Sequence, residues 1–425
     1  MVGNVSDVGG TGTAVGAPRV VPLRDNAGFR LLWIGQLLSD TGSETGRLAY
    51  PLLILALTHS AVLAGAVGTA RAIAVFCVQL PGGPLADRFD RRLTMIACDT
   101  MRALLLALLA VLIVVQLASW PVVLVVSLIE GAAGAIFNPA ASAALPAIVP
   151  DGQLERAWAA TEARMYGASL AGPALGGALF ALGRAIPFLA DAVSYAASFG
   201  TVSRIKGSFR PERTATRKAL WREVADGLRV VWQVPVLRTV VIAAPLVNFA
   251  FTGVFFTITL ALRQHGTSTA VIGLVQAAIA AGGLLGAVLA PRLQGRLRLS
   301  TMVATIDTAG ALLFGVAALL IASPLVAVPV ALSMLLAPAV NASLVAVMLR
   351  SAPEEMRGRV SNTVLMAATA LSTLAPLAAG LFVQHVSAAW AIGAFAVAMT
   401  AAAVIGQLLP GLREAEALAA APDRK

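Results

Sequence analysis

Twelve stretches of mainly apolar residues alternate with short polar connections along this chain. A helix needs about 20 apolar residues to cross the hydrocarbon core of a bilayer, and every stretch comes close to that length or exceeds it. The stretches lie at 29–57, 61–86, 93–116, 121–145, 157–182, 186–204, 238–263, 268–291, 299–322, 324–349, 359–384 and 388–410. The pattern therefore predicts an all-α membrane protein with twelve transmembrane helices.

The second half of the chain repeats the first. Six identities share an offset of 203 positions (286 − 83): Gly83 and Gly286, Asn138 and Asn341, Pro150 and Pro353, Arg156 and Arg359, Pro173 and Pro376, Gly177 and Gly380. The repeat predicts two equivalent six-helix bundles, at 29–204 and 238–410. Between them we expect a cytoplasmic linker, 205–237, ending in an interfacial helix. Residues 1–28 are predicted to be a disordered cytoplasmic tail, and 411–425 a second cytoplasmic tail.

Basic residues are concentrated in alternate connections between the stretches. One set of connections holds Arg88, Arg91, Arg92, Arg156, the cluster from Arg204 to Arg229, Arg292, Arg296, Arg298, Arg350, Arg357 and Arg359. The opposite connections hold little beyond Arg184 and Arg263. The positive-inside rule then predicts a multi-pass protein of the cell (inner or plasma) membrane with both termini in the cytoplasm.

Composition agrees with a membrane protein and argues against several other classes. The hydrophobic fraction of 58% and mean hydropathy of +0.85 exceed the roughly 45–50% apolar content of soluble domains. The net charge of +10 is scattered among the connections, so no nucleic acid partner is expected. With two cysteines, and with histidines only at expected outer span ends, we predict no disulfide, no metal site and no cofactor. No lysine lies in a phosphate-binding GxxxxGK pattern, which argues against ATP as the energy source.

The most specific motif is GPLADRFDRR, starting at Gly83 between the second and third stretches. It resembles the GxLADRxGRR loop of major facilitator superfamily transporters, which implies that fold and a transport function. FNPAASAALPAIVP at Phe137, FLADAVSY at Phe188 and APEEMRGRV at Ala352 are similar to the branch with macrolide efflux proteins and enterobactin exporters.

The resemblance also implies a cytoplasmic gate. In the family, a glycine at the position of Gly83 allows close helix approach, and the aspartate meets a helix start in the other half, here expected near Arg359. The gate residues are then Gly83, Asp87, Arg88, Arg91, Arg92 and Arg359. Asp90 departs from the glycine usual in the family, and the second-half copy, GAVLAPRLQGR, lacks the aspartate. The alternative interpretation is that these charges only enforce topology.

The fifth stretch contains Gly167, Gly172, Pro173, Gly176 and Gly177, which resemble the GPxxGG motif of the antiporter branch. Small residues let helix backbones approach, and the proline frees a carbonyl and permits a bend. The motif favours export over import. Glycine-rich packing without directional meaning is the alternative.

Ionisable residues inside the stretches are candidates for proton coupling or for the substrate cavity, because a charge at the bilayer centre costs at least about 2.5–3.5 kcal/mol. Asp40, Glu44 and Arg47 are spaced four and three apart and share one helix face. Arg71 and Glu130 lie at a similar depth, so a buried charge cluster is possible. Arg164, Asp191 and Asp307 are further candidates, nearer one surface or on peripheral helices.

Together these features predict a secondary transporter, not an enzyme. The leading interpretation is a monomer in the lipid bilayer that expels an amphipathic small molecule in exchange for protons, carried by Asp40, Glu44 or Glu130. Salt bridges that only neutralise one another are the structural alternative. An importer or facilitator of a polar solute and a lipid flippase are alternative functions on the same fold.

Overall fold

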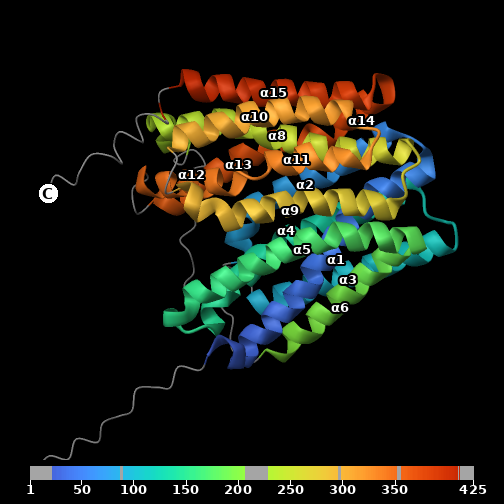
Figure 1. Ribbon diagram of the computed structural model, residues 1–425. Helices are drawn as coiled ribbons and strands as arrows, with labels where there is room; N and C mark the ends of the chain where they lie inside the picture. Colours follow the sequence, from blue (N-terminus) through green and yellow to red (C-terminus); the bar gives the residue numbers. More distant parts are fainter. Residues whose placement is uncertain are drawn as a thin grey trace, which may run out of the picture.

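The computed structural model describes residues 22–86, 90–205, 228–294, 298–351, 356–409 and 411. The described elements are all helices (Figure 1). In the first half of the chain they are η1 (Leu23–Asp25), α1 (Ala27–Thr58), α2 (Ala61–Ala86), α3 (Arg91–Val114), α4 (Trp120–Ile148), η2 (Asp151–Gln153), α5 (Leu154–Leu182) and α6 (Ile186–Arg204). In the second they are α8 (Pro235–Gln264), α9 (Thr269–Gln294), α10 (Leu299–Leu319), η3 (Pro324–Val326), α11 (Ala327–Ser333), α12 (Ala337–Ser351), α13 (Arg357–Ala370), η5 (Leu371–Leu374), α14 (Ala375–His385) and α15 (Ala388–Leu408).

Ten helical segments among the described residues are long and apolar enough to cross a membrane. With α1 and α6, which have 32 and 19 residues, they make the twelve spans that the hydropathy pattern predicts. Three ionisable residues, Asp40, Glu44 and Arg47, interrupt the apolar run of α1. The chain is therefore an all-helical membrane protein.

The start of α1 is fixed by a capping residue inside the expected tail. The Asn26 side chain accepts a hydrogen bond from Phe29 N (3.1 Å) and donates one to Ile148 O (3.0 Å) at the end of α4. This cap satisfies an orphan amide of the first helical turn and ties α1 to its neighbour. The described helix η1 thus lies within the stretch 1–28. Residues 1–21 lie outside the described part of the chain.

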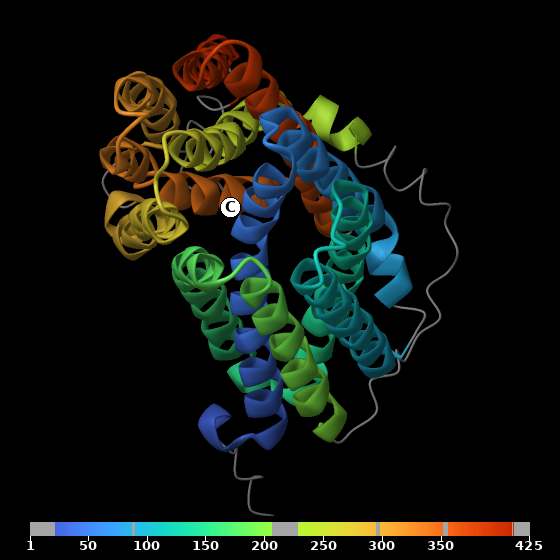
Figure 2. The same cartoon turned by 90° about the vertical axis from the view of Figure 1, so that its right-hand side faces the viewer.

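The spans form two groups that follow the sequence repeat. In the N-terminal half α6 packs against α1 and α3, and α2 packs against α4. The C-terminal half repeats this arrangement, with α15 against α8 and α10, and α9 against α11 and α12. Figures 1 and 2 show the two halves joined along two helix pairs, α5 with α9 and α2 with α14. These two helix pairs make most of the contact between the halves.

Two spans that hydropathy predicts as continuous are interrupted. The stretch 324–349 consists of η3, α11 and α12, with non-helical residues 334–336 ahead of Pro338. The stretch 359–384 tightens to a 3-10 turn, η5, directly before Pro376. Proline lacks the amide for an i to i−4 bond and its ring clashes with the carbonyl four residues earlier, which explains both interruptions. Hydropathy alone does not report them.

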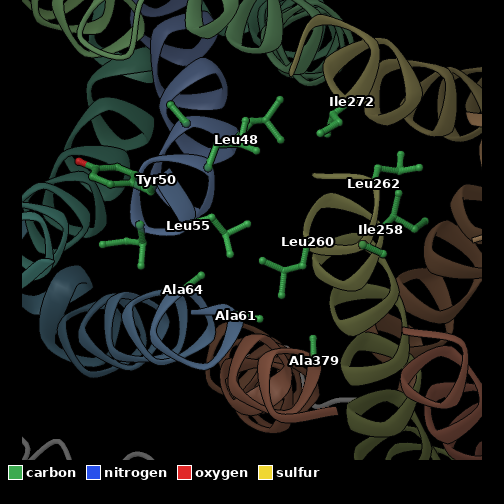
Figure 3. Close-up of a cluster of buried hydrophobic side chains, with 14 of the residues drawn as sticks. Leu48, Tyr50, Leu55, Ala61, Ala64, Ile258, Leu260, Leu262, Ile272 and Ala379 are labelled. Carbon is green, nitrogen blue, oxygen red and sulfur yellow. The ribbon is translucent and has the colours of Figure 1, made fainter. Parts of the chain in front are cut away.

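The two ends of the molecule differ in how the halves meet. We call the end where α1 begins and α15 ends the terminal end, and the opposite one the far end. At the far end one apolar cluster unites both halves, and Figure 3 shows Leu48 and Leu55 of α1 beside Leu260 and Leu262 of α8. At the terminal end the buried apolar residues form two separate clusters, one in each half. Among the described residues, one apolar cluster therefore spans both halves at the far end, whereas each cluster at the terminal end is confined to one half.

Glycines bring the backbones of the two halves together at the far end. A Cβ at Gly177 of α5 would overlap Thr269 O, at the first residue of α9, and would lie 2.8 Å from Gly273 Cα. In the other pair, a Cβ at Gly380 of α14 would overlap Ala61 O, at the first residue of α2. Gly177 and Gly380 are partners in the sequence repeat, so the duplication produced the same close crossing twice.

The predicted linker, 205–237, is described only in part. Residues 206–227, which carry most of its charges, lie outside the described residues. Residues 228–233 are helical, and α8 begins at Pro235, slightly earlier than the pattern indicates. Val231 is 1% exposed and belongs to the apolar cluster of the C-terminal half. The described end of the linker therefore packs on that half.

Candidate functional site: a charged network in the N-terminal half

A buried carboxylate on α4 connects four helices. Glu130 is 2% exposed, and its Oε2 accepts hydrogen bonds from Arg71 of α2 through Nε (3.2 Å) and Nη2 (2.8 Å). Its Oε1 accepts one from Arg102 of α3 (3.2 Å) and one from the Tyr195 hydroxyl of α6 (3.1 Å). Charge-assisted bonds of this kind are the strong ones in protein interiors. The structure therefore brings Arg71 and Glu130 together, as their similar depth suggests.

Arg102 and Tyr195 are the part of this network that the sequence reasoning missed. The Arg102 guanidinium donates to the Tyr195 hydroxyl and to Ser43 Oγ of α1 (3.1 Å). Its Cζ lies 3.8 Å from the centroid of the Tyr195 ring, a cation–π arrangement. A signal was present, because Arg102 follows Asp99 by three residues inside an apolar span, the spacing that marks the polar face of α1.

The polar face of α1 divides between two ion pairs. Asp40 Oδ2 lies 2.6 Å from Arg164 Nη1 of α5, and the Asp40 side chain is 30% exposed whereas that of Arg164 is 5% exposed. Glu44 Oε1 lies 2.7 Å from Arg47 Nη2 within α1, and the Arg47 side chain is 69% exposed. Residues that share a face of one helix thus have different partners, because Asp40 lies beside α5 at a depth where α5 carries an arginine.

The glycines of the fifth span hold α5 against its neighbours. A Cβ at Gly172 would overlap the Glu44 side chain, and one at Gly176 would lie 2.8 Å from Thr45 O, both on α1. Gly177 and the carbonyl of Pro173 face α9 of the other half. The helix stays regular from Leu154 to Leu182 through Pro173. This set therefore places the charged face of α1 next to the helix that contacts the C-terminal half.

The gate residues predicted from the motif are described only in part. Asp87 and Arg88 lie outside the described residues, and of Gly83 only the helical backbone is described. Arg91 Nη1 donates to Ala143 O of α4 (2.9 Å), and Arg92 donates to Ser203 O of α6. These bonds hold the start of α3 within its own half. Arg359 lies in the first turn of α13, and its carbonyl accepts from Thr363 Oγ1 (2.8 Å).

The C-terminal half has far fewer buried charges. Among the described residues, the buried acidic and basic side chains are Asp99, Arg102, Glu130, Arg164 and Asp191 in the first half and Asp307 in the second. The C-terminal half buries mainly neutral polar groups, for example Gln276, which donates to Thr259 Oγ1 (2.7 Å). The described residues contain no cluster of metal ligands. Among the described residues, the buried charged side chains therefore lie mainly in the N-terminal half.

A network of this kind suits a protein that moves solutes. Charges buried in a membrane span carry a desolvation cost and are retained mainly where they pair, line a pathway or bind an ion. Two helical halves that share an apolar cluster at one end and, among the described residues, have separate clusters at the other, with such a network beside their interface, are typical of a membrane transporter.

Comparison with known proteins specifies the family. The chain belongs to the transmembrane secretion effector family of the major facilitator superfamily, whose model matches residues 17–425. It is 28% identical over 405 residues to the multidrug efflux pump Tap of Mycolicibacterium fortuitum, covering 90% of this chain and 96% of that one. It is 26% identical over 407 residues to Tap of Mycobacterium tuberculosis, covering 90% and 94%. The chain is thus a small-molecule transporter of an efflux family, not an enzyme.

Solved transporters share the fold at low sequence identity. A bacterial homologue of the iron transporter ferroportin, solved in an inward-facing state, superposes with a TM-score of 0.71 at 15% identity, covering 91% of this chain and 98% of that chain. A bacterial homologue of the lysosomal transporter Spinster, inward-facing and unoccupied, gives 0.68 at 14% identity, with 93% and 97% covered. These likenesses establish the major facilitator fold.

Proposed function

We propose that this protein expels amphipathic small molecules from the cell in exchange for protons, by alternating access. The basic connections belong to the terminal end, so the positive-inside rule supports a cytoplasmic position for that end and for both termini. The lack of a shared apolar cluster at that end, among the described residues, supports loading of cargo from the cytoplasm. Distant relationship to multidrug efflux pumps supports the direction and the class of cargo.

The observation that carries the proposal is the ion pair between Asp40 and Arg164. Asp40 is the more exposed partner, so protons can reach it, whereas Arg164 is buried. A proton on Asp40 removes its attraction for Arg164 and weakens the contact between α1 and α5. Because α5 also carries the close crossing with α9, protonation at Asp40 acts on the interface between the halves.

The proton gradient supplies enough free energy for this task. One proton moving inward contributes about 1.4 kcal/mol per pH unit and about 2.3 kcal/mol per 100 mV. One pH unit and 100 mV together correspond to a concentration ratio of roughly 500 for a neutral cargo exchanged for one proton. Exchange for one proton therefore supplies enough free energy to export cargo against a large concentration gradient.

The test measures accumulation of ethidium, an amphipathic cationic dye, in inside-out membrane vesicles with an imposed inside-acid pH gradient. We expect Asp40→Asn to abolish gradient-driven accumulation while dye still equilibrates, because the neutral side chain mimics a permanently protonated acid. Glu44→Gln should lower the rate less than about threefold, since its partner Arg47 is largely exposed and exposed pairs contribute little. Glu130→Gln should impair transport through loss of the network.

Asp25→Asn is the matched control. Asp25 is an exposed aspartate outside the spans, paired with Arg24 at 3.7 Å, and its loss should leave accumulation unchanged. Wild-type accumulation in all three acid variants would refute the proposed coupling. Wild-type vesicles that move phospholipid but not dye would point to a flippase, and accumulation only against the opposite gradient would point to an importer.

A further inference from the structure

Five buried polar residues lie on α3 and α6, which pack against each other, and we call this group the α3/α6 seam: Asp99 and Arg102 on α3, and Asp191, Tyr195 and Ser198 on α6. Each is at most 5% exposed. Since α3 and α6 run in opposite directions, Asp99 lies toward the terminal end from the Arg102–Tyr195 contact and Asp191 lies toward the far end. At 1.5 Å per helical residue, the two carboxyl groups are about 10 Å apart along the helices.

Asp99 is buried with little to stabilise a negative charge. It is 0% exposed, and neither of its carboxyl oxygens makes a hydrogen bond of good geometry, although the Ser198 hydroxyl of α6 lies close enough to interact with it. Arg102, one turn further along α3, also leaves its Nε without a partner. An ionised carboxylate without hydrogen bonds is strongly disfavoured in an apolar interior. The buried Asp99 side chain is therefore stabilised when it binds a proton or when a positive charge lies close to it.

Asp191 occupies a niche that two glycines of α1 leave open. A Cβ at Gly42 would overlap Asp191 Oδ1, and a Cβ at Gly46 would lie 3.1 Å from Asp191 Oδ2. Ser194 Oγ lies 2.8 Å from the Asp191 carbonyl oxygen and 3.1 Å from Asp191 Oδ1. A serine hydroxyl has a single proton, which these two oxygens share, so Oδ1 receives at most a weak hydrogen bond.

Charge balance leaves one proton for the seam. Two pairs near it are neutral by themselves, Asp40 with Arg164 and Glu44 with Arg47. Glu130 neutralises one of its two arginine partners, so one positive charge remains opposite the two seam carboxyls. Other titratable groups close to the seam are the neutral side chains of Tyr50 on α1 and Cys98 on α3. A low-dielectric interior favours neutrality, which one ionised and one protonated aspartate achieve.

We propose that Asp99 and Asp191 share one exchangeable proton and form a proton-binding site in addition to Asp40. When Asp191 releases the proton and Asp99 takes it up, the ionised partner of Arg102 changes from Asp99 to Asp191 and the net charge stays constant. Because the two acids lie on opposite sides of Arg102 along the membrane normal, the exchange moves a proton between the two ends of the bundle. This site rests on the proposed proton-coupled function.

The second half of the chain supplies a matched control. Asp307 is the ninth residue of α10, as Asp99 is of α3, and both begin the pattern Asp-Thr-x-x-Ala-Leu-Leu. Asp307 is also buried, at 2% exposed, with Oδ2 lacking a partner. Gly310 stands where the first half has Arg102. Without an arginine one turn away, Asp307 keeps its proton throughout and should not contribute to coupling.

The test measures protons exchanged per ethidium in proteoliposomes, from the pH gradient at which dye flux stops under a fixed dye gradient with the membrane potential clamped at zero. We expect Asp99→Asn and Asp191→Asn each to exchange one proton fewer than wild type, because the remaining aspartate stays ionised beside Arg102. Asp307→Asn should keep the wild-type ratio.

The outcomes separate this inference from the proposed function. Wild-type coupling with an unchanged ratio in both seam variants would overturn the shared proton and leave proton-driven efflux standing. An equal fall in Asp307→Asn would overturn it as well, because the effect would then follow from loss of any buried acid. A wild-type protein that exchanges no protons would refute both. If one seam variant does not fold, the other variant decides.

Discussion

Replacing Gly177 by valine is expected to reduce efflux about tenfold. The new side chain would overlap the carbonyl of Thr269 and crowd the backbone of Gly273, so α5 and α9 could not meet at the far end. Overpacking of this kind costs about 1–3 kcal/mol, and 1.4 kcal/mol shifts a two-state equilibrium about tenfold. The measurement is the rate of ethidium efflux from cells that contain equal amounts of each variant.

Gly167→Val, on the same helix, is the control for this prediction. A Cβ at Gly167 meets nothing within 4 Å, so the substitution makes the same change of helix propensity without the contact. We expect it to keep efflux within about twofold of wild type, because valine is no worse a helix former than glycine. Equal efflux in the two variants would show that the close crossing is not needed for transport.

Arg102→Ala is expected to cause the largest loss of stability among single substitutions in the charged network. It removes donors to Glu130, Tyr195 and Ser43 and leaves their buried oxygens without that cation. Breaking a buried pair by deleting one partner costs about 3–5 kcal/mol. Thermal unfolding of the purified protein, followed by the exposure of Cys98, which is buried in the folded state, measures the effect.

Two further variants show whether this loss arises from the network. Arg47→Ala removes an arginine that is 69% exposed and should cost less than about 1 kcal/mol. Glu130→Gln combined with Arg102→Ala should lose less than the sum of the single variants, because the two side chains contact each other and each single variant already removes the ion pair between them. Additive losses, or an Arg102→Ala variant as stable as Arg47→Ala, would contradict the role assigned to Arg102.

The sequence predicts the architecture better than the site. Hydropathy locates all twelve spans because burial in lipid makes whole segments apolar. The offset repeat predicts two bundles, and it pairs Gly177 with Gly380, which the structure places at equivalent crossings between the halves. The breaks before Pro338 and Pro376 leave no trace in hydropathy, since the residues around them are apolar.

Which side chains pair within the site depends on how neighbouring helices pack, and the spacing of residues along one helix does not show this. Spacing places Asp40, Glu44 and Arg47 on one face, but the choice of Arg164 for Asp40 follows from how α5 packs on α1 through Gly172 and Gly176. Tyr195 lies in the FLADAVSY motif, where the sequence offers no reason to single out its hydroxyl. Its importance emerges only when α3, α4 and α6 are seen together.

The uneven distribution of buried charge between the halves has an evolutionary consequence. A duplication produced two similar copies, yet of the buried acids and bases among the described residues all but Asp307 lie in the first copy. Energy conversion and cargo recognition can then diverge separately. We expect natural variation in drug spectrum to accumulate in helices after Pro235, where a change of side chain disturbs no ionised partner. A chimera with a relative's second half should then transport that relative's drugs while keeping its own proton-coupling residues.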